Sequence, residues 1–136
     1  MIRSHSKGIY VTDCDGKAVE GNPRVMSLVK ELEARAVNET SGFARYYPVV
    51  VQEYFGGIKK HLASVKPLLR EDGLCAYVLG DQSSYLGVHI PTAEIIRDLA
   101  YEVGFGAASI EHWRNRWSTA TSKKMEENIL VLRNSR

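Results

Sequence analysis

The sequence predicts an α/β domain in which three helices flank a small sheet. Apolar residues recur at helical spacing over residues 23–36, 45–69 and 92–103. Short apolar segments at residues 74–79 and 128–133 have the length and composition of strands. Because these helices and strands follow one another within 136 residues, one domain with a modest core is expected.

The composition excludes several classes of protein. The chain is 44% hydrophobic and 25% charged, which is typical of a soluble globular protein. A net charge of +2 is too small an excess to indicate nucleic-acid binding by itself. No apolar run approaches the ~20 residues that span a bilayer, and the N-terminus has no apolar signal-peptide core. Cys14 and Cys75 do not have the spacing of metal ligands. We expect Cys75 to be buried and no disulfide to form. The protein is therefore predicted to be cytoplasmic.

Residues 1–22 are poor in apolar residues and rich in turn formers. Only the segment 8–12 (GIYVT) could form a short strand, and the remainder is expected to be an irregular, partly disordered arm. The expected organisation is therefore an N-terminal arm or lead-in over residues 1–22 and one domain over residues 23–136.

The three predicted helices have recognisable ends. Asn22 is expected to cap the first helix, with Pro23 at its first position. The third helix is expected to start at Thr92 after Pro91 and to stop at Gly104. The second helix has the most regular apolar stripe, which consists of Val51, Phe55, Ile58, Leu62, Val65 and Leu69.

Gly56 and Gly57 stand in the middle of the second predicted helix. Each glycine costs a helix about 1 kcal/mol relative to alanine, so the pair needs a reason. Close packing of another helix is the favoured interpretation. Close approach to a ligand or a partner chain is the alternative.

The apolar segment 74–79 (LCAYVL) follows a tight turn that ends at Gly73. A continuous apolar run of this length predicts a strand that is buried on both faces. A polar loop, residues 80–85, follows this strand. Open α/β sheets bind ligands outside the C-terminal ends of such strands, so this loop is the first candidate for a site.

The last part of the chain predicts a long hairpin. Residues 107–116 are a strand candidate, residues 118–126 are expected to form its loop, and residues 128–133 are the last, antiparallel strand. Simple alternation would place three basic side chains on one face and the remaining side chains on the other. The two sets are His112, Arg114 and Arg116, and Trp113, Asn115 and Trp117.

The sequence contains no P-loop, GxGxxG, HExxH or GxSxG motif, and its four histidines are scattered singly. No metal site is therefore expected. Asp81 could bind a ligand group or form hydrogen bonds within its own loop, and the second interpretation is favoured because aspartate is common in turns. The same alternatives stay open for Ser83, Ser84 and Tyr85.

Arg114 and Arg116 could contact phosphate groups. A solvated face at the edge of a strand is the favoured interpretation of this pair. Lys123 and Lys124 are expected to lie at the tip of a loop.

Four segments, taken in order, resemble the C-terminal half of a class I S-adenosylmethionine-dependent methyltransferase. The resemblance is strongest to DNA methyltransferases that modify the exocyclic amino group of adenine or cytosine, and it covers about residues 24–133. The segments are VKPLLREDG, LCAYVLGDQ, SSYLGVHIPTAEIIRDLAYEVGF and MEENILVLR. Within them the residues that match the family's pattern are Pro67, Gly73, Gly80, Asp81, Ile90, Pro91, Thr92 and residues 127–132.

This resemblance implies a partial Rossmann-like methyltransferase sheet. The strand 74–79 corresponds to the family's fifth strand. The strand 128–133 corresponds to its seventh, which is inserted antiparallel between the fifth and the sixth. In a complete enzyme the reaction would be methyl transfer from S-adenosylmethionine to an amino group of a DNA base.

The resemblance also implies that functional parts lie outside this sequence. The family binds S-adenosylmethionine with a glycine-rich turn after its first strand, and it holds the target base with an Asp/Asn/Ser-Pro-Pro-aromatic motif after its fourth. Neither motif is present here, so no catalytic residue is assigned and no tight cofactor binding is expected. What remains is the rim of a site, assigned to Gly80, Asp81, Gln82, Ser83, Ser84 and Tyr85, with Arg114 and Arg116 as further candidates.

Half of a sheet leaves a strand without a neighbour. The strand 74–79 is expected to pair with the last strand on one side only, and an unpaired apolar edge favours association. A homodimer, or a second chain that supplies the missing half, is therefore expected. Binding of DNA to this chain alone is expected to be weak and sensitive to salt. The alternative function is a non-catalytic interaction domain that retains the methyltransferase fold.

Overall fold

The computed structural model describes residues 1–40, 42–83, 85–119 and 122–135. It divides the chain into two compact units, one comprising Met1–Lys60 and Tyr85–Val88, the other His61–Ser84 and His89–Arg136. The described residues contain three α-helices and a three-stranded antiparallel sheet, so the predicted α/β class with three helices is confirmed. Each unit is described by itself below.

Helix α1, Pro23–Ala36, belongs to the first unit and begins where the sequence predicts. The side chain of Asn22 accepts a hydrogen bond from the backbone N–H of Val25 at 3.0 Å, and Pro23 stands in the first turn, where its missing N–H costs nothing. The helix buries the apolar side of its stripe, which consists of Val25, Val29 and Leu32.

Residues 1–22 form two short 3-10 helices, Ser6–Gly8 and Asp15–Val19. The short strand suggested for residues 8–12 does not form. The reason is local, because Asp13 closes a turn on Tyr10. The carboxylate of Asp13 accepts a hydrogen bond from the Tyr10 N–H at 2.8 Å, and the Asp13 N–H donates to the Tyr10 carbonyl at 3.0 Å.

Helix α2, Tyr47–Val65, is flanked by 3-10 turns at Ala44–Tyr46 and Lys66–Leu68. The predicted segment 45–69 is thus helical throughout most of its length, with tighter turns at its ends. Residues of α2 up to Lys60 belong to the first unit, and those from His61 belong to the second. The stripe residues Val51, Phe55 and Leu62 are all buried.

The glycine pair of α2 admits the chain's own backbone. A Cβ atom on Gly56 would overlap the carbonyl group of Asp15, and one on Gly57 would lie 3.3 Å from the side chain of Ile2. The favoured interpretation was close packing of another helix. The element that packs here is a 3-10 helix, Asp15–Val19, which begins at the point of closest approach.

The second unit contains the sheet, whose strands are β1 (Leu74–Gly80), β2 (Ala107–Ser118) and β3 (Lys123–Arg133). The order is β1-β3-β2, and β3 is antiparallel to both neighbours. The predicted position of the last strand is therefore confirmed. Since β1 and β2 both oppose β3, they run parallel to each other.

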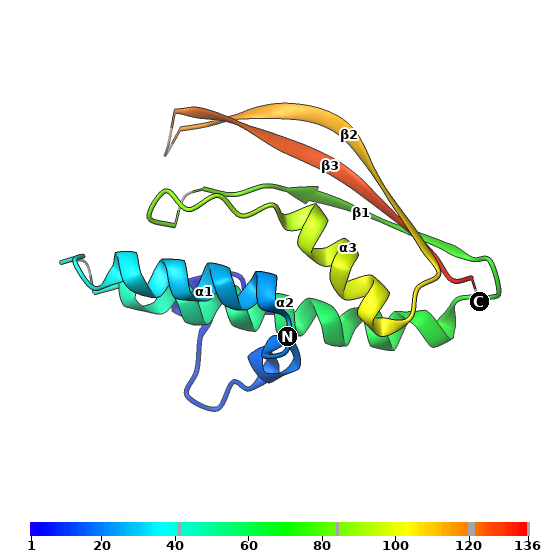
Figure 1. Cartoon of the computed structure of the whole chain (residues 1–136), viewed down its shortest axis with the longest axis horizontal. Helices are drawn as coiled ribbons and strands as arrows, with labels where there is room; N and C mark the ends of the chain where they lie inside the picture. Colours follow the sequence, from blue (N-terminus) through cyan, green and yellow to red (C-terminus); the bar gives the residue numbers. More distant parts are fainter. Residues whose placement is uncertain (41, 84, 120–121, 136) are drawn as a thin grey trace. The chain divides into compact units, whose positions relative to one another are not determined.

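Helix α3, Thr92–Val103, connects β1 to β2 and lies against one face of the sheet (Figure 1). It ends at Gly104, whose φ of 105° is the left-handed conformation that glycine adopts at a helix C-terminus. The core between helix and sheet consists of Ile95, Ile96, Leu99, Leu130 and Leu132, all at most 1% exposed.

Burial of β1 on both faces is contradicted. Leu74 is 56% exposed and Val78 is 62% exposed, while Cys75 is only half-buried. The alternation arises because α3 covers one face, on which Cys75 and Tyr77 pair with Leu132 and Leu130 of β3. The apolar composition of β1 therefore does not mean that the described residues bury both of its faces.

The hairpin strands are longer than predicted. Strand β2 continues to Ser118 and β3 begins at Lys123, so most of the predicted loop 118–126 is strand. Lys123 and Lys124 accordingly lie in β3 and not in a loop. Polar residues such as these carry little strand signal in sequence, although their backbone groups continue the ladder.

Candidate functional site

The loop at the C-terminal end of β1 is held by backbone hydrogen bonds. The Asp81 N–H donates to the carbonyl of Glu126 at 2.9 Å, which extends the contact of β1 with β3. Gln82 and Ile90 then form an isolated antiparallel bridge, with N–H to O distances of 3.2 and 2.6 Å. These bonds fix Gly80, Asp81 and Gln82 beside the hairpin.

Asp81 is buried at the start of helix α3, with 7% of its surface exposed. Its carboxylate accepts a hydrogen bond from the backbone N–H of Thr92, and one oxygen lies 3.5 Å from Nε2 of His89. Burial raises the pKa of Asp81 above its ordinary value, and the nearby His89 opposes that shift. The favoured interpretation, a local hydrogen-bonding role, agrees with this placement, since the carboxylate serves an N–H group that the helix cannot satisfy itself.

Ser83 is also buried, and its hydroxyl donates to the sulfur of Met125 at 3.1 Å. This contact joins the loop to β3 near the start of that strand. Gly80 lies against β2, since a Cβ atom there would be 3.7 Å from the guanidinium of Arg116. The structure thus brings Gly80, Asp81 and Ser83 together with the hairpin.

Arg114 and Arg116 share one carboxylate. Nε of Arg114 lies 2.6 Å from one oxygen of Glu127, and Nε of Arg116 lies 3.3 Å from the other. Arg116 also donates to the carbonyl of Asp81 at 3.4 Å. The two guanidinium groups exceed the charge of this one carboxylate by one, and the Arg114 and Arg116 side chains, 59% and 43% exposed, remain accessible to an anionic group.

A β-bulge changes the faces of β2. The register shifts between His112 and Arg114, so that His112 pairs with Asn128 and Arg114 pairs with Glu127. Because one extra residue is inserted at Trp113, His112 lies on the opposite face from Arg114 and Arg116. The predicted grouping of these three basic side chains is therefore wrong, and only the two arginines share a face.

Tyr85 belongs to the first unit and not to the unit that contains Gly80–Ser83. Its ring stacks on Tyr47 with centroids 4.3 Å apart and planes 6° from parallel, and its hydroxyl donates to the carbonyl of Ser4 at 3.3 Å. Burial raises its pKa. Ser84 lies outside the described residues.

The second unit contains another polar cluster, which the sequence analysis did not identify. Nε2 of His61 lies 3.0 Å from the hydroxyl of Tyr77, with the rings edge to face. Burial raises the pKa of Tyr77 to about 12 and raises that of the Cys75 thiol. A tyrosine and a thiol that hold their protons are not poised for nucleophilic attack. The alternation of Cys75 and Tyr77 along the strand is the signal that could have grouped them.

Glu53 in α2 is the other group that the sequence did not single out. It is 7% exposed, one oxygen accepts the Gly16 N–H at 3.1 Å, and the other has no hydrogen-bond partner among the described residues. Its role is to anchor the segment that packs on Gly56.

No group of three or more His, Cys, Asp or Glu side chains within the described ranges is placed to hold a metal ion. Over the same ranges, no helix combines the length and apolar character needed to cross a membrane. Comparisons of the chain with protein-family models, with curated proteins and with solved structures give no match.

Proposed function

We propose that this chain is the C-terminal portion of an S-adenosylmethionine-dependent methyltransferase-like protein, which in its complete form methylates an amino group of a DNA base. One observation carries the proposal. The last strand, β3, lies antiparallel between β1 and β2, and α3 connects those two parallel strands. This is the arrangement that the resemblance implies for the family's fifth, seventh and sixth strands.

On this proposal the sheet is the edge of a larger Rossmann-like sheet. The loop after β1 would then form one wall of a ligand site, since ligands in open α/β sheets bind beyond the C-terminal ends of the parallel strands. The positive charge of Arg114 and Arg116 beside Gly80 and Asp81 supports a rim that faces an anionic substrate.

The residues of this chain do not fit the cofactor by themselves. The sequence has no glycine-rich turn after a strand and no Pro-Pro-aromatic motif. At the one strand end that the resemblance assigns to the site, Asp81 is engaged with Thr92 and Ser83 with Met125. S-adenosylmethionine would supply the methyl group, and the proposal assigns its binding, and the catalytic motif, to residues outside this sequence.

The free edge of β1 supports a partner. Among the described residues β1 pairs with β3 alone, and Leu74 and Val78 expose apolar surface beside the unpaired edge. The proposal therefore includes a homodimer or a second chain that supplies the missing half. Light scattering on the purified chain tests the first possibility, and a monomer would argue against it. The free thiols of Cys14 and Cys75 support a cytoplasmic location.

The experiment that tests the function combines two measurements. The DNA preceding the codon for Met1 is sequenced for an open frame that encodes both missing motifs. That frame is co-expressed with this chain, and transfer of tritiated methyl groups from S-adenosylmethionine to unmethylated DNA is measured. Transfer that requires both polypeptides supports the proposal. A preceding frame without the motifs, or a co-purified complex without transfer, would count against it.

A non-catalytic interaction domain is the second candidate. The observation that favours it is that the sequence carries neither the cofactor-binding turn nor the catalytic motif of the family. Such a domain would bind a partner through the β1 edge and would show no methyl transfer in any combination. The methyl-transfer experiment therefore separates the two candidates.

A further inference from the structure

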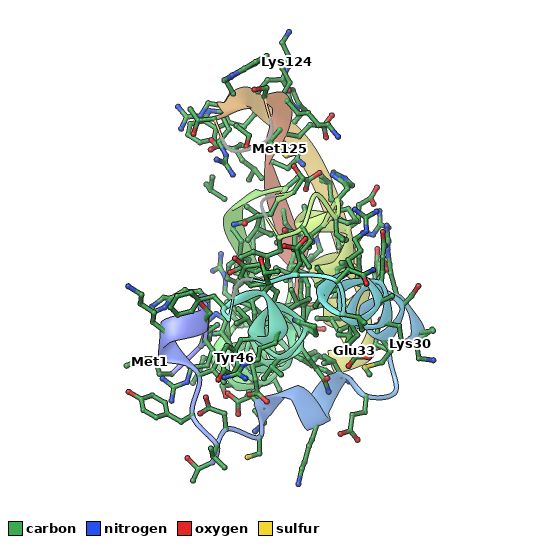
Figure 2. The ribbon with its side chains drawn as sticks, turned by 90° about the vertical axis from the view of Figure 1, so that its left-hand side faces the viewer. Met1, Lys30, Glu33, Tyr46, Lys124 and Met125 are labelled. Carbon is green, nitrogen blue, oxygen red and sulfur yellow. The ribbon has the colours of Figure 1, made fainter. Side chains whose placement is uncertain are left out.

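The outer half of the β2–β3 hairpin, residues 112–119 and 122–127, concentrates exposed aromatic and basic side chains. We call it the hairpin tip. Trp113 is 49% exposed and Trp117 is 61% exposed, which is unusual for so large an apolar side chain. Figure 2 shows Lys124 at the far end of this hairpin. The charged residues are Arg114, Arg116, Lys123, Lys124, Glu126 and Glu127, so the tip alone carries the chain's whole net charge of +2.

The cross-strand pairs place an aromatic ring beside a cation. Trp117 pairs directly with Lys124, whereas Ser118 pairs with Lys123 on the opposite face, which Arg114 and Arg116 share. Residues opposite one another in an antiparallel pair project to the same face, so the indole of Trp117 and the ammonium group of Lys124 lie on one surface. An exposed ring next to an exposed cation can contact a base and its phosphate at the same time.

The bulge produces a second aromatic–cation pair. The guanidinium of Arg114 lies 4.2 Å from the centroid of the Trp113 ring, and its Nε is bonded to Glu127. The Arg114 side chain remains 59% exposed. The carboxylate thus fixes the direction of the arginine while leaving most of its five N–H donors for other contacts.

We propose that the hairpin tip binds single-stranded nucleic acid. On one face of the two-stranded ribbon an unpaired base stacks on Trp117 while Lys124 contacts a phosphate, and where the strand crosses to the other face Arg114 and Lys123 contact phosphates beside Trp113. Interleaved aromatic and basic side chains are the chemistry by which proteins bind single strands without reading sequence. A duplex hides its base faces, whereas a single strand presents unstacked bases next to phosphates, so it is the occupant that uses both the indoles and the cations.

This inference goes beyond the proposed function, because it needs neither the cofactor nor the missing half. It also predicts how strongly salt acts. With about three phosphates neutralised on a single strand, affinity falls about 20-fold between 50 and 200 mM salt. The small net charge of the chain agrees with weak binding, which we expect to be on the order of micromolar at low salt.

The full-length chain reports on this surface directly. Trp113 and Trp117 are the only two tryptophans in the sequence, so all of the protein's tryptophan fluorescence comes from the proposed site. Stacking of bases on the indoles should therefore quench that fluorescence. The probe is a fluorescein-labelled oligothymidine of about 12 nucleotides, a length within the usual single-strand site size. Saturable quenching, with a matching rise in the anisotropy of the probe, is the expected result.

Matched variants divide the two contributions. Trp117→Ala weakens binding about tenfold, because one stacked base is lost. The double variant Lys123→Gln, Lys124→Gln reduces the salt effect from about 20-fold to about 3-fold. Glu127→Gln removes the shared carboxylate and strengthens binding at low salt. Lys30→Gln, at an exposed position on α1, and Tyr101→Ala, at an exposed position on α3, leave binding unchanged.

Each remaining outcome decides the proposal. Binding of a labelled oligouridine within a few-fold of oligothymidine supports the proposal. A preference for the RNA oligomer or for the DNA oligomer also supports it, because both are single strands. Three results overturn it. They are no quenching up to about 100 μM protein at low salt, duplex DNA bound as tightly as a single strand, and anionic lipid vesicles that quench tryptophan when the oligonucleotides do not. Circular dichroism confirms that each variant is folded.

Discussion

Replacing Gly56 by alanine should destabilise the first unit, although alanine is the better helix former. The added Cβ would overlap the carbonyl group of Asp15 and lie 2.8 Å from the backbone nitrogen of Gly16. Backbone atoms cannot rotate out of the way as a side chain can. The 3-10 helix that starts at Asp15 must therefore move away from α2.

The size of the effect follows from the contacts of that segment. The Gly16 N–H donates to Glu53 at 3.1 Å, and the Gln52 side chain donates to the Gly16 carbonyl at 3.1 Å. Losing two such bonds costs about 2 kcal/mol, or overpacking costs about 1–3 kcal/mol if the segment stays in place. Alanine returns about 1 kcal/mol through helix propensity. The net destabilisation is about 1 kcal/mol if the bonds are lost, and about 0–2 kcal/mol if the segment stays in place.

Gly57→Ala is the matched control, because it makes the same change one residue later. Its Cβ would meet the side chain of Ile2 at 3.3 Å, and Ile2 is 37% exposed and can adjust. This variant should be neutral or more stable by up to about 1 kcal/mol. Urea unfolding followed by far-UV circular dichroism gives the free energies, and amide hydrogen exchange at Gly16 reports on the segment. A Gly56→Ala protein as stable as Gly57→Ala, with Gly16 still protected, would refute the reasoning.

Three further changes test the second unit and the two thiols. Burial raises the pKa of Asp81 in the folded state, so its protonated form favours folding below the unfolded pKa, and that stabilisation is lost as pH rises through the folded pKa. The free energy of unfolding of Asp81→Asn should therefore rise relative to that of the parent chain as pH goes from acidic to neutral. Free energies from urea unfolding that change in parallel with pH for the two proteins would contradict this. Tyr77→Phe removes the hydrogen bond to His61 and should cost about 1 kcal/mol in the same assay, whereas no loss would show that the bond contributes nothing. Cys14 is exposed, while Cys75 is half-buried with a raised pKa, so iodoacetamide should label Cys14 first in peptide mass mapping, and faster labelling of Cys75 would be inconsistent with the structure.

Local signals located the helices well, because each helix end depends on residues that are adjacent in sequence. Asn22 and Pro23 define the start of α1, and Gly104 defines the end of α3. The antiparallel direction of β3 was predicted from the hairpin pattern, whereas its central position came from the family resemblance and not from any local pattern. The sheet order agrees with it, while the family itself stays a prediction.

The errors arose where a residue's environment depends on distant parts of the chain. The apolar segment 74–79 has the composition of a strand buried on both faces, yet Leu74 and Val78 are exposed because α3 covers one face only. One inserted residue at Trp113 reverses the faces of β2, and no pattern in the sequence marks the insertion.

The candidate site was predicted in part. The structure brings Gly80, Asp81 and Arg116 together at the end of β1, and their role as the rim of a site stays a prediction. It assigns Tyr85 to the other unit, where Tyr47 provides its stacking partner from 38 residues earlier in the chain. Sequence proximity alone could not separate Tyr85 from Ser83, because the division of the chain into units is a property of the folded structure.

We propose that this chain is one part of a methyltransferase-like protein whose cofactor site lies outside its sequence. The most direct measurement is isothermal titration of S-adenosylmethionine into the chain alone and into its co-purified complex with the polypeptide encoded immediately upstream. We expect no micromolar binding by the chain alone and saturable binding by the complex. Micromolar binding by the chain alone, or none by the complex, would contradict it.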